Sequence, residues 1–264
     1  MRNKRNSGWN FIIYCKTLNK KRRADSLLFT RGFTGSRERA RDLINDGVVQ
    51  ADGLPVTKPS KLLAPDCEIV LRSAGNPWVS RAGLKLAAGL EQFSMIDVAG
   101  RYAIDIGAST GGFTEVLLAN RAKHVVAIDV GRRQLHKKIA SDHRVTIMDK
   151  TNARHLRLNM LAMPADLIVC DASFISLKKV LPAAMGLAAS GAYILALIKP
   201  QFEVGRGLVG KGGIVRDHDL LMDVITDIEY WFSKEMRWKH IGTIKSPILG
   251  RDGNQEFLLA GQKL

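Results

Sequence analysis

The sequence has few cysteines, no long apolar run and, in its first 23 residues, no acidic residue at all. Its three cysteines, Cys15, Cys67 and Cys170, are odd in number and lie far apart. They match neither a metal-ligand spacing nor a disulfide framework, which fits a protein of the reducing cytoplasm. No stretch of about 18 apolar residues occurs, so we expect no membrane-spanning helix.

The absence of acidic residues makes the start of the chain strongly basic. Residues 1–23 contribute +8 of the formal net charge of +15, which leaves +7 for the rest. This surplus favours a polyanionic partner, first of all nucleic acid, although solvated lysines and a loose tail would explain the same charge. We expect residues 1–22 to be a disordered basic arm, because the apolar patch at residues 9–15 lacks the length and cleavage site of a signal peptide.

Residues 23–73 are predicted to form a small α+β unit. Apolar periodicity indicates helices at residues 23–30 and 36–46. Ser36 is suited to cap the start of the second helix, and Gly47 to follow its end.

A β-hairpin is expected next, at residues 48–56, because Asp52 and Gly53 form a typical two-residue turn between apolar runs. Residues 68–73 are predicted to be a further strand. Basic side chains on one side of this unit would contact RNA phosphates. The candidate RNA-binding residues are Arg23, Arg37, Arg41, Lys58 and Lys61.

The rest of the chain reads as a second domain at residues 81–264, after a linker at residues 74–80. Short apolar strands alternate with helices from Arg101 onward, which is typical of βαβ units around a parallel sheet. The last two strands have no helix between them and should pair antiparallel. We therefore predict an α/β fold, a Rossmann-like sheet of seven mostly parallel strands with an antiparallel last strand. The expected strands are residues 102–107, 124–130, 144–149, 166–171, 192–199, 238–244 and 255–261. The expected helices are residues 80–93, with Ser80 as cap, 110–120, 132–140, 176–189 and 218–232.

A glycine-rich turn follows the first of these strands, in the segment DIGASTGGF from Asp105 to Phe113. The dinucleotide fingerprint would need glycine where Ser109 stands, which disfavours an NAD-dependent oxidoreductase. An acid two residues before the first glycine, and glycines that let the backbone approach a ligand, suit S-adenosylmethionine. A tight turn that serves another ligand is the alternative.

Two further acids extend this cofactor prediction. Asp129 ends the second strand and would accept the ribose hydroxyls, and Asp149 ends the third and could meet the adenine amine. The candidate cofactor-binding residues are Asp105, Gly107, Ser109, Thr110, Gly111, Gly112, Phe113, Asp129, Val130, Asp149 and Asp171.

A second glycine-rich segment, residues 205–213, partly matches a phosphate-binding loop. Gly212 stands where Ser or Thr would hold magnesium, and no flanking strand and helix are apparent. We reject a phosphate-binding loop and expect a flexible loop beside the active site. No metal site is expected.

Four charged residues are predicted to meet at the edge of the sheet where ligands bind, beyond the carboxyl ends of the parallel strands. Asp171 ends the fourth strand and Lys199 ends the fifth. Glu256 begins the antiparallel last strand on the same edge, and Lys85 precedes the first strand and could close the group. Each alone has an ordinary explanation as a salt bridge or a solvated charge, but together they predict a catalytic group.

Lys199 is the candidate general base of this group. The pKa of an exposed lysine, about 10.4, is too high for this role. Burial, Lys85 and a cationic sulfonium would lower the pKa, whereas Asp171 and Glu256 would raise it. The sequence leaves both outcomes open.

Five segments together resemble the TlyA (hemolysin A) family: SRAGLKL, DIGASTGGFTEVLL, DASFISL, KPQFEVG and GNQEFLL. Its members resemble FtsJ-type ribose 2′-O-methyltransferases joined to an RNA-binding domain of the ribosomal-protein-S-four type. The resemblance runs from about residue 23 to the end of the sequence, and the tail before it is not part of the pattern.

The resemblance implies a Lys-Asp-Lys-Glu tetrad, carried here by Lys85, Asp171, Lys199 and Glu256. It also implies S-adenosylmethionine as methyl donor, ribosomal RNA or ribosomal subunits as partner, and cytidine 2′-hydroxyls as target. An RNA-binding ribosome-assembly factor with an inactive enzyme domain is one alternative, which the complete tetrad disfavours. A cytolysin, suggested by the family's other name, is the second alternative, but no signal peptide, membrane span or lipid-binding pattern supports it.

Overall fold

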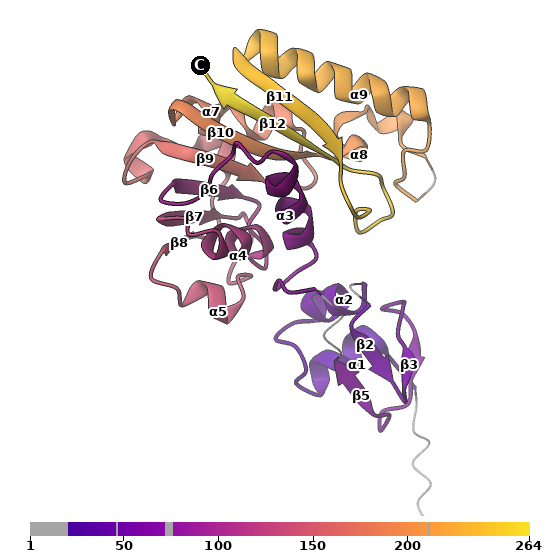
Figure 1. Cartoon of the computed structure of the whole chain (residues 1–264). Helices are drawn as coiled ribbons and strands as arrows, with labels where there is room; N and C mark the ends of the chain where they lie inside the picture. The colour runs from indigo at the N-terminus through magenta and orange to yellow at the C-terminus, as the bar shows by residue number, and fades with distance from the viewer. Residues whose placement is uncertain (1–20, 46, 72–75, 211) are drawn as a thin grey trace, which may run out of the picture. The chain divides into compact units, whose positions relative to one another are not determined.

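The chain divides into two compact units, residues 1–74 and 75–264, in the computed structural model (Figure 1). The structure describes residues 21–45, 47–71, 76–210 and 212–264. Most of the predicted basic arm, with Cys15, therefore lies outside the described residues. No helix within these ranges is long and apolar enough to cross a membrane.

The first unit packs two helices against short strands. Its elements are β1 (Arg22–Arg23), α1 (Ala24–Thr30), α2 (Arg37–Asn45), β2 (Val49–Ala51), β3 (Leu54–Pro55), β4 (Leu62–Leu63) and β5 (Ile69–Leu71). The strand order in one sheet is β3-β2-β5, and β1 pairs with β4 in a separate ribbon. Leu27 and Leu28 of α1 pack with Ala40 and Ile44 of α2 in the core of the unit.

Local sequence explains these elements. The Ser36 hydroxyl accepts a hydrogen bond from the amide of Arg39 at 3.1 Å, as the predicted helix cap. Gly47 has a φ of +72°, which suits a glycine after a helix end. Asp52 and Gly53 both have positive φ in the hairpin turn, as a type I′ turn requires. The β1–β4 ribbon was not predicted and places Arg22, expected in the disordered arm, in a strand.

The second unit is one large sheet covered by helices. Its strands are β6 (Tyr102–Ile106), β7 (His124–Ile128), β8 (Val145–Met148), β9 (Ala165–Cys170), β10 (Ala188–Ile198), β11 (Trp238–Lys245) and β12 (Phe257–Lys263). The α-helices are α3 (Ala82–Gln92), α4 (Gly112–Ala119), α5 (Lys137–Ala140), α6 (Leu177–Val180), α7 (Pro182–Gly186), α8 (Pro200–Glu203) and α9 (His218–Tyr230). Short 3₁₀ turns lie at Ala153–His155, Leu158–Met160 and Arg206–Leu208, and a π-helical turn follows α9 at Trp231–Glu235.

The order of the strands confirms the predicted fold class. The sheet runs β11-β12-β10-β9-β6-β7-β8, and β12 is antiparallel to both of its neighbours. The pairs from β10 to β8 are all parallel. Because β12 alone is reversed, it begins at the edge where the parallel strands end.

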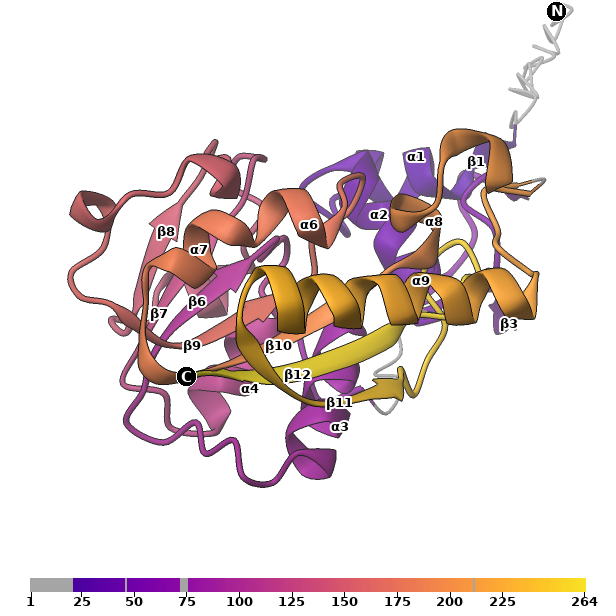
Figure 2. The same ribbon diagram turned by 90° about the horizontal axis from the view of Figure 1, so that it is seen from above.

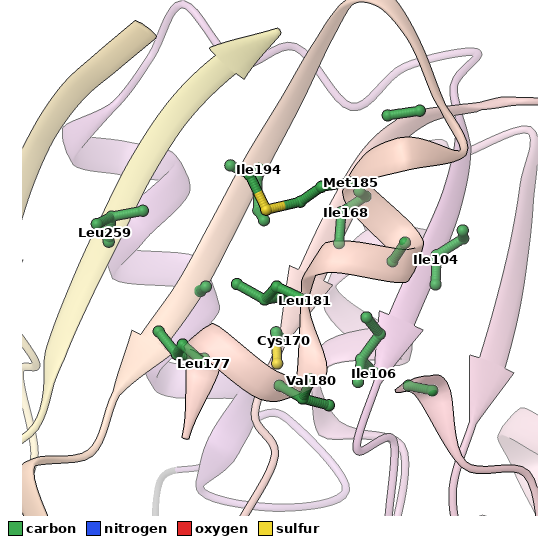
Figure 3. Packing of buried hydrophobic residues seen from close by; sticks show 14 of the residues in the cluster. Ile104, Ile106, Ile168, Cys170, Leu177, Val180, Leu181, Met185, Ile194 and Leu259 are labelled. Carbon is green, nitrogen blue, oxygen red and sulfur yellow. The ribbon is translucent and has the colours of Figure 1, made fainter. Parts of the chain in front are cut away.

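Both faces of the sheet are buried, and alternate residues of each strand point to opposite sides. Leu195 and Leu197 of β10 pack with α3 and α4 on one face. Ile194, Ala196 and Ile198 pack with α6, α7 and α9 on the other. Figures 1 and 2 show these two helical layers, and Figure 3 shows the apolar contacts between the second layer and the strands.

Several predicted helix bounds were wrong. The helix expected at residues 176–189 divides into α6 and α7, because Pro182 lacks an amide hydrogen and starts a new helix. Strand β10 then already begins at Ala188. The helix expected at residues 132–140 is reduced to α5. Ser80 does not cap α3, which begins after Arg81 without a side-chain cap.

Candidate active site

Two buried ion pairs lie at the carboxyl edge of the large sheet. The Nζ atom of Lys199 lies 2.6 Å from Oδ1 of Asp171. The Nζ atom of Lys85 lies 2.5 Å from Oε2 of Glu256. All four side chains are at most 14% exposed. The structure thus brings together the four residues that the sequence placed at this edge.

Strand register explains why these residues meet. Ile198 of β10 pairs with Phe257 of β12, so the next residues along the two antiparallel strands are Lys199 and Glu256. Asp171 directly follows β9, which pairs parallel with β10. Lys85 reaches the group from α3, the helix that packs on this face of the sheet.

Four buried charges are poor evidence for stability, because removing two ions from water costs about as much as their attraction returns. Apolar side chains of similar size would hold these strands together at least as well. Perturbed and buried ionisable groups of this kind concentrate at sites that do chemistry. The two pairs therefore point to a reactive site at this edge.

Lys199 is held by several acceptors. Its ammonium also donates to the backbone oxygen of Asp171 at 3.2 Å and to the hydroxyl of Ser173 at 2.8 Å. Burial lowers the pKa of Lys199, but the charges of Asp171 and Glu256 outweigh burial, so the pKa lies above its usual value. The carboxylates thus prevail over burial and favour the ammonium form of Lys199.

The glycines of the turn after β6 make room for other parts of the chain. A Cβ at Gly107 would lie 2.9 Å from the backbone oxygen of Asp171, and one at Gly112 would lie 2.2 Å from the Ser80 hydroxyl. Gly107 and Gly111 also have φ of +80° and +94°, which few other residues adopt. The sequence suggested that these glycines admit a ligand, but in the structure they bring α3, α4 and β9 close to the turn.

Asp105 is fully buried below this turn. One of its carboxylate oxygens accepts a hydrogen bond from the Thr114 hydroxyl at 2.6 Å, and the other, Oδ1, has no hydrogen-bond partner. Burial raises the pKa of Asp105 to about 7, despite the hydrogen bond from Thr114. Asp105 therefore supports the turn from inside the protein.

The two acids predicted to bind adenosine lie in the loops at the ligand edge. The Asp129 carboxylate accepts from the amides of Ser109 at 2.8 Å and Gly131 at 2.7 Å. Asp149 accepts from the amide of Arg133 at 2.8 Å. Both acids are partly exposed, so each can still meet a ligand.

The other predicted cofactor residues differ in how far their side chains are exposed. Val130 is 71% exposed beside Asp129, whereas Phe113 is 2% exposed and packs in the core. The Phe113 side chain therefore does not reach the ligand edge, and only its backbone amide in the first turn of α4 remains available for a ligand. Ser109 and Thr110 lie in the turn between β6 and α4.

Sequence reasoning missed an aromatic pair beside Lys199. Phe174 is 90% exposed, has a φ of +65°, and lies with its ring centroid 5.1 Å from that of Phe202. Glu203 holds the same two segments together, because its carboxylate accepts from the amide of Leu177 at 2.9 Å. The positive φ of Phe174 is a strain that sequence periodicity does not indicate.

Asn254, also missed, ties two loops together next to Glu256. Its side chain is almost fully buried, accepts from the amide of Val215 at 2.9 Å and donates to the oxygen of Gly213 at 2.8 Å. Its backbone oxygen accepts from the amide of Gly250, whose Cα borders the Glu256 carboxylate. Asn254 thus anchors Gly213, at the end of the second glycine-rich segment, beside the Lys85–Glu256 pair.

Three of the five predicted RNA-binding residues of the first unit gather around one acid. Arg23, Arg37 and Arg41 each form a salt bridge with buried Asp25 at 3.0, 3.2 and 3.3 Å. Exposed Lys58 and Lys61 flank the turn whose backbone oxygens accept from the amides that open α1. Asp25 itself was not predicted.

Metal and thiol chemistry find little support in the described ranges. No group of three potential metal ligands occurs among these residues. Burial raises the pKa of the Cys170 thiol to about 12, so it stays protonated near neutral pH.

Comparisons with known proteins match both units. Residues 78–263 match the FtsJ-like methyltransferase family, and residues 22–69 match the S4 domain. The 16S/23S rRNA (cytidine-2′-O)-methyltransferase TlyA of Mycobacterium tuberculosis is 44% identical over 91% of this chain and 89% of its own length. Hemolysin A of Brachyspira hyodysenteriae is 39% identical over 89% of this chain and 98% of its own length. A solved structure from Streptococcus thermophilus, provisionally named a hemolysin, superposes with a TM-score of 0.73 at 37% identity, covering 93% of this chain and 89% of that one.

Proposed function

This chain belongs to the FtsJ-like methyltransferase family and carries an S4 domain before the methyltransferase domain. From that premise we propose that it transfers a methyl group from S-adenosylmethionine to the ribose 2′-hydroxyl of cytidine in ribosomal RNA. The observation that carries the proposal is the pair of buried salt bridges, Lys199–Asp171 and Lys85–Glu256, at the ligand edge. Relatives at 44% identity are named for this reaction.

The ligand edge fits the chemistry of S-adenosylmethionine. The partly exposed carboxylate of Asp129 suits the ribose hydroxyls, and exposed Val130 offers an apolar surface to adenine. The first turn of α4, with the amides of Gly112 and Phe113, suits the carboxylate of the methionine part. The buried Asp105 would hold this turn in place. Gly107, Ser109, Thr110, Gly111, Asp149 and Asp171 complete the proposed cofactor site.

The cofactor, when bound, supplies an electrophilic methyl group on a cationic sulfur. Lys199 can accept the proton of the 2′-hydroxyl only in its neutral form, and its pKa is raised in the ligand-free protein. The positive charge of the cofactor's sulfonium, close to Lys199, would lower that pKa and favour the neutral amine. Asp171 and Ser173 orient the Lys199 nitrogen, and Lys85 neutralises the nearby charge of Glu256. We propose that Lys199 acts as the general base in this way.

The S4 domain is proposed to supply affinity for RNA. We take residues 23–73 as the RNA-binding domain, 74–80 as the linker and 81–264 as the methyltransferase domain. Arg23, Arg37, Arg41, Lys58 and Lys61 would contact phosphates rather than base edges. Ribosomal RNA or a ribosomal subunit is the proposed partner.

Lys199→Ala tests the proposal. Methyl transfer to ribosomal RNA, measured with a radiolabelled methyl donor, should fall by about 10²–10⁴-fold, because general base catalysis is lost. Cofactor binding by calorimetry and RNA binding by filter retention should stay near the wild-type values. Lys178→Ala is the control, since Lys178 forms an exposed pair with Asp227, and its transfer rate should not change.

Near-normal transfer by Lys199→Ala would contradict the role of Lys199. A wild-type protein that binds cofactor and RNA but transfers no methyl group would instead favour an RNA-binding assembly factor. Leakage of dye from liposomes at low protein concentration, measured on the same preparation, would favour the cytolysin reading suggested by the names of some relatives.

A further inference from the structure

A buried carboxylate organises three arginines on the S4 domain. The Asp25 side chain is fully buried. Its Oδ1 accepts from Nε of Arg23 at 3.0 Å and from the amide of Ser26 at 2.8 Å. Its Oδ2 accepts from Nη2 of Arg23 at 3.1 Å, Nη2 of Arg37 at 3.2 Å and Nε of Arg41 at 3.3 Å. Three guanidinium groups, one from β1 and two from α2, thus share one acid.

The backbone brings these groups together from three directions. Arg23 lies in β1, immediately before the helix that carries Asp25. Arg37 and Arg41 are four residues apart on α2 and so project from the same face of that helix. The amide of Asp25 donates to the oxygen of Pro59 at 3.1 Å, which places the turn with Lys58 against the same point.

Satisfying Asp25 does not require three arginines. A bidentate contact with Arg23 and the amide of Ser26 already supply hydrogen bonds to both carboxylate oxygens. Adding Arg37 and Arg41 brings three like charges close together, which is unfavourable unless something else uses them. A purely structural salt bridge would need fewer cations.

The arginine side chains remain open to solvent. Those of Arg23, Arg37 and Arg41 are 48%, 47% and 50% exposed. A guanidinium group has five N–H donors, of which these contacts with Asp25 use one or two, so each half-exposed arginine keeps further donors that a ligand could use. One carboxylate against three guanidinium groups leaves a surplus of two positive charges, which suits phosphodiester groups.

We propose that Asp25 is a positioning residue for RNA binding, because its carboxylate aligns the three arginines as one site for phosphodiester groups. This inference rests on the proposed RNA substrate. Because the buried acid already orients these long side chains, they lose less conformational entropy when they bind a ligand. The Asp25 carboxylate therefore acts through the arginines and does not touch RNA itself.

The test compares two substitutions that each remove one negative charge from the S4 domain. Asp25→Asn removes the charge that aligns the arginines, and Asp66→Asn removes an exposed charge elsewhere in the unit. Simple electrostatics predicts tighter RNA binding for both. We expect Asp66→Asn to bind ribosomal RNA as tightly as the wild type or more tightly, and Asp25→Asn to bind about tenfold more weakly, as expected when charge-assisted contacts are lost.

The salt dependence separates positioning from stability. We expect the magnitude of the slope of log K against log salt concentration to decrease by about 1–2 for Asp25→Asn in the full chain, because fewer phosphates are contacted. Partial unfolding would reduce the fraction of protein that binds but would leave the slope of the folded remainder unchanged. In ¹⁵N spectra, the Nε–H signals of the three arginines should lose their dispersion while the amides of Leu27 and Ile44 keep theirs.

Arg37→Lys keeps the test valid if Asp25→Asn does not fold. Lysine keeps the charge but lacks the planar fork, so binding should weaken several-fold if orientation matters. Equal binding by wild type and Arg37→Lys, or tight binding with an unchanged salt slope by a folded Asp25→Asn, would overturn the inference. A wild-type protein without affinity for ribosomal RNA would instead contradict the proposed function.

Discussion

At the scale of single residues, the protonation of Lys199 governs the proposed chemistry. Its position at the end of β10 places its ammonium group beside two carboxylates, whose charges outweigh burial and keep the pKa above the usual value. A base that starts in its charged form limits the reaction at neutral pH. The rate of methyl transfer should therefore rise with pH toward the alkaline side.

Glu256→Gln should shift that pH profile. Removing the negative charge of Glu256 takes away one of the influences that raise the pKa of Lys199. In a plot of the single-turnover rate against pH, we expect the rising limb to move to lower pH by about one unit, even if the maximal rate falls. Glu235→Gln, at an exposed position, should leave the limb in place. A limb that stays or moves up in Glu256→Gln would contradict the assignment of Lys199 as base.

At the scale of elements, the glycine-rich turn joins α3, α4 and the strands into one support for the site. Gly112 opens α4 directly against the start of α3. The segment after β10 and the loop before β12 are held in the same manner by the half-buried side chain of Glu203 and the buried side chain of Asn254. Catalytic groups on loops thus acquire fixed positions from contacts that lie behind them.

Gly112→Ala should destabilise the second unit. The new Cβ would lie 2.2 Å from the Ser80 hydroxyl and 2.9 Å from the backbone nitrogen of Gly83, so one helix must shift. We expect a loss of about 1–3 kcal/mol in the free energy of unfolding, measured with denaturant. Gly186→Ala is the matched control at the end of α7, where nothing lies within 4 Å of the new Cβ, and it should change stability by at most about 1 kcal/mol. Equal stability of the two variants would show that the α3–α4 contact yields easily.

At the scale of the whole molecule, the positive charge is distributed over both units. The net charge of +15 favours association with RNA at low salt, and part of it gathers on the S4 domain around Asp25. At the ligand edge, the methyltransferase unit holds Lys199 with Asp171 and Lys85 with Glu256 in two neutral pairs. This division suits a molecule in which one unit binds RNA and the other performs the transfer.

The double variant Lys58→Gln, Lys61→Gln should weaken RNA binding through salt-dependent contacts alone. Loss of two phosphate contacts should reduce the magnitude of the slope of log K against log salt by about 1–2. Cofactor affinity, measured by calorimetry, should be unchanged. Lys239→Gln is the control, because strand register places Lys239 at the opposite edge of the sheet from Lys199. A slope that does not respond to the double variant would remove the two lysines from the proposed RNA site.

The sequence by itself determined the fold class, the antiparallel direction of the last strand and the residues that meet at the ligand edge. Strand periodicity and the rule that parallel strands end at one edge are local or topological, so Asp171, Lys199 and Glu256 could be placed without coordinates. The family resemblance was also confirmed. It rests on five short motifs, and each motif can be recognised in the sequence without coordinates.

Only the tertiary structure decided how these groups influence one another. The direction of the Lys199 pKa depends on distances to two carboxylates and on burial, and neither can be read from spacing. The division of the helix at residues 176–189, the close contact at Gly112 and the arginines around Asp25 likewise arise where separate elements pack together. Contacts between distant segments carry no periodic signal in the sequence, and they set the geometry on which the proposed chemistry and RNA binding depend.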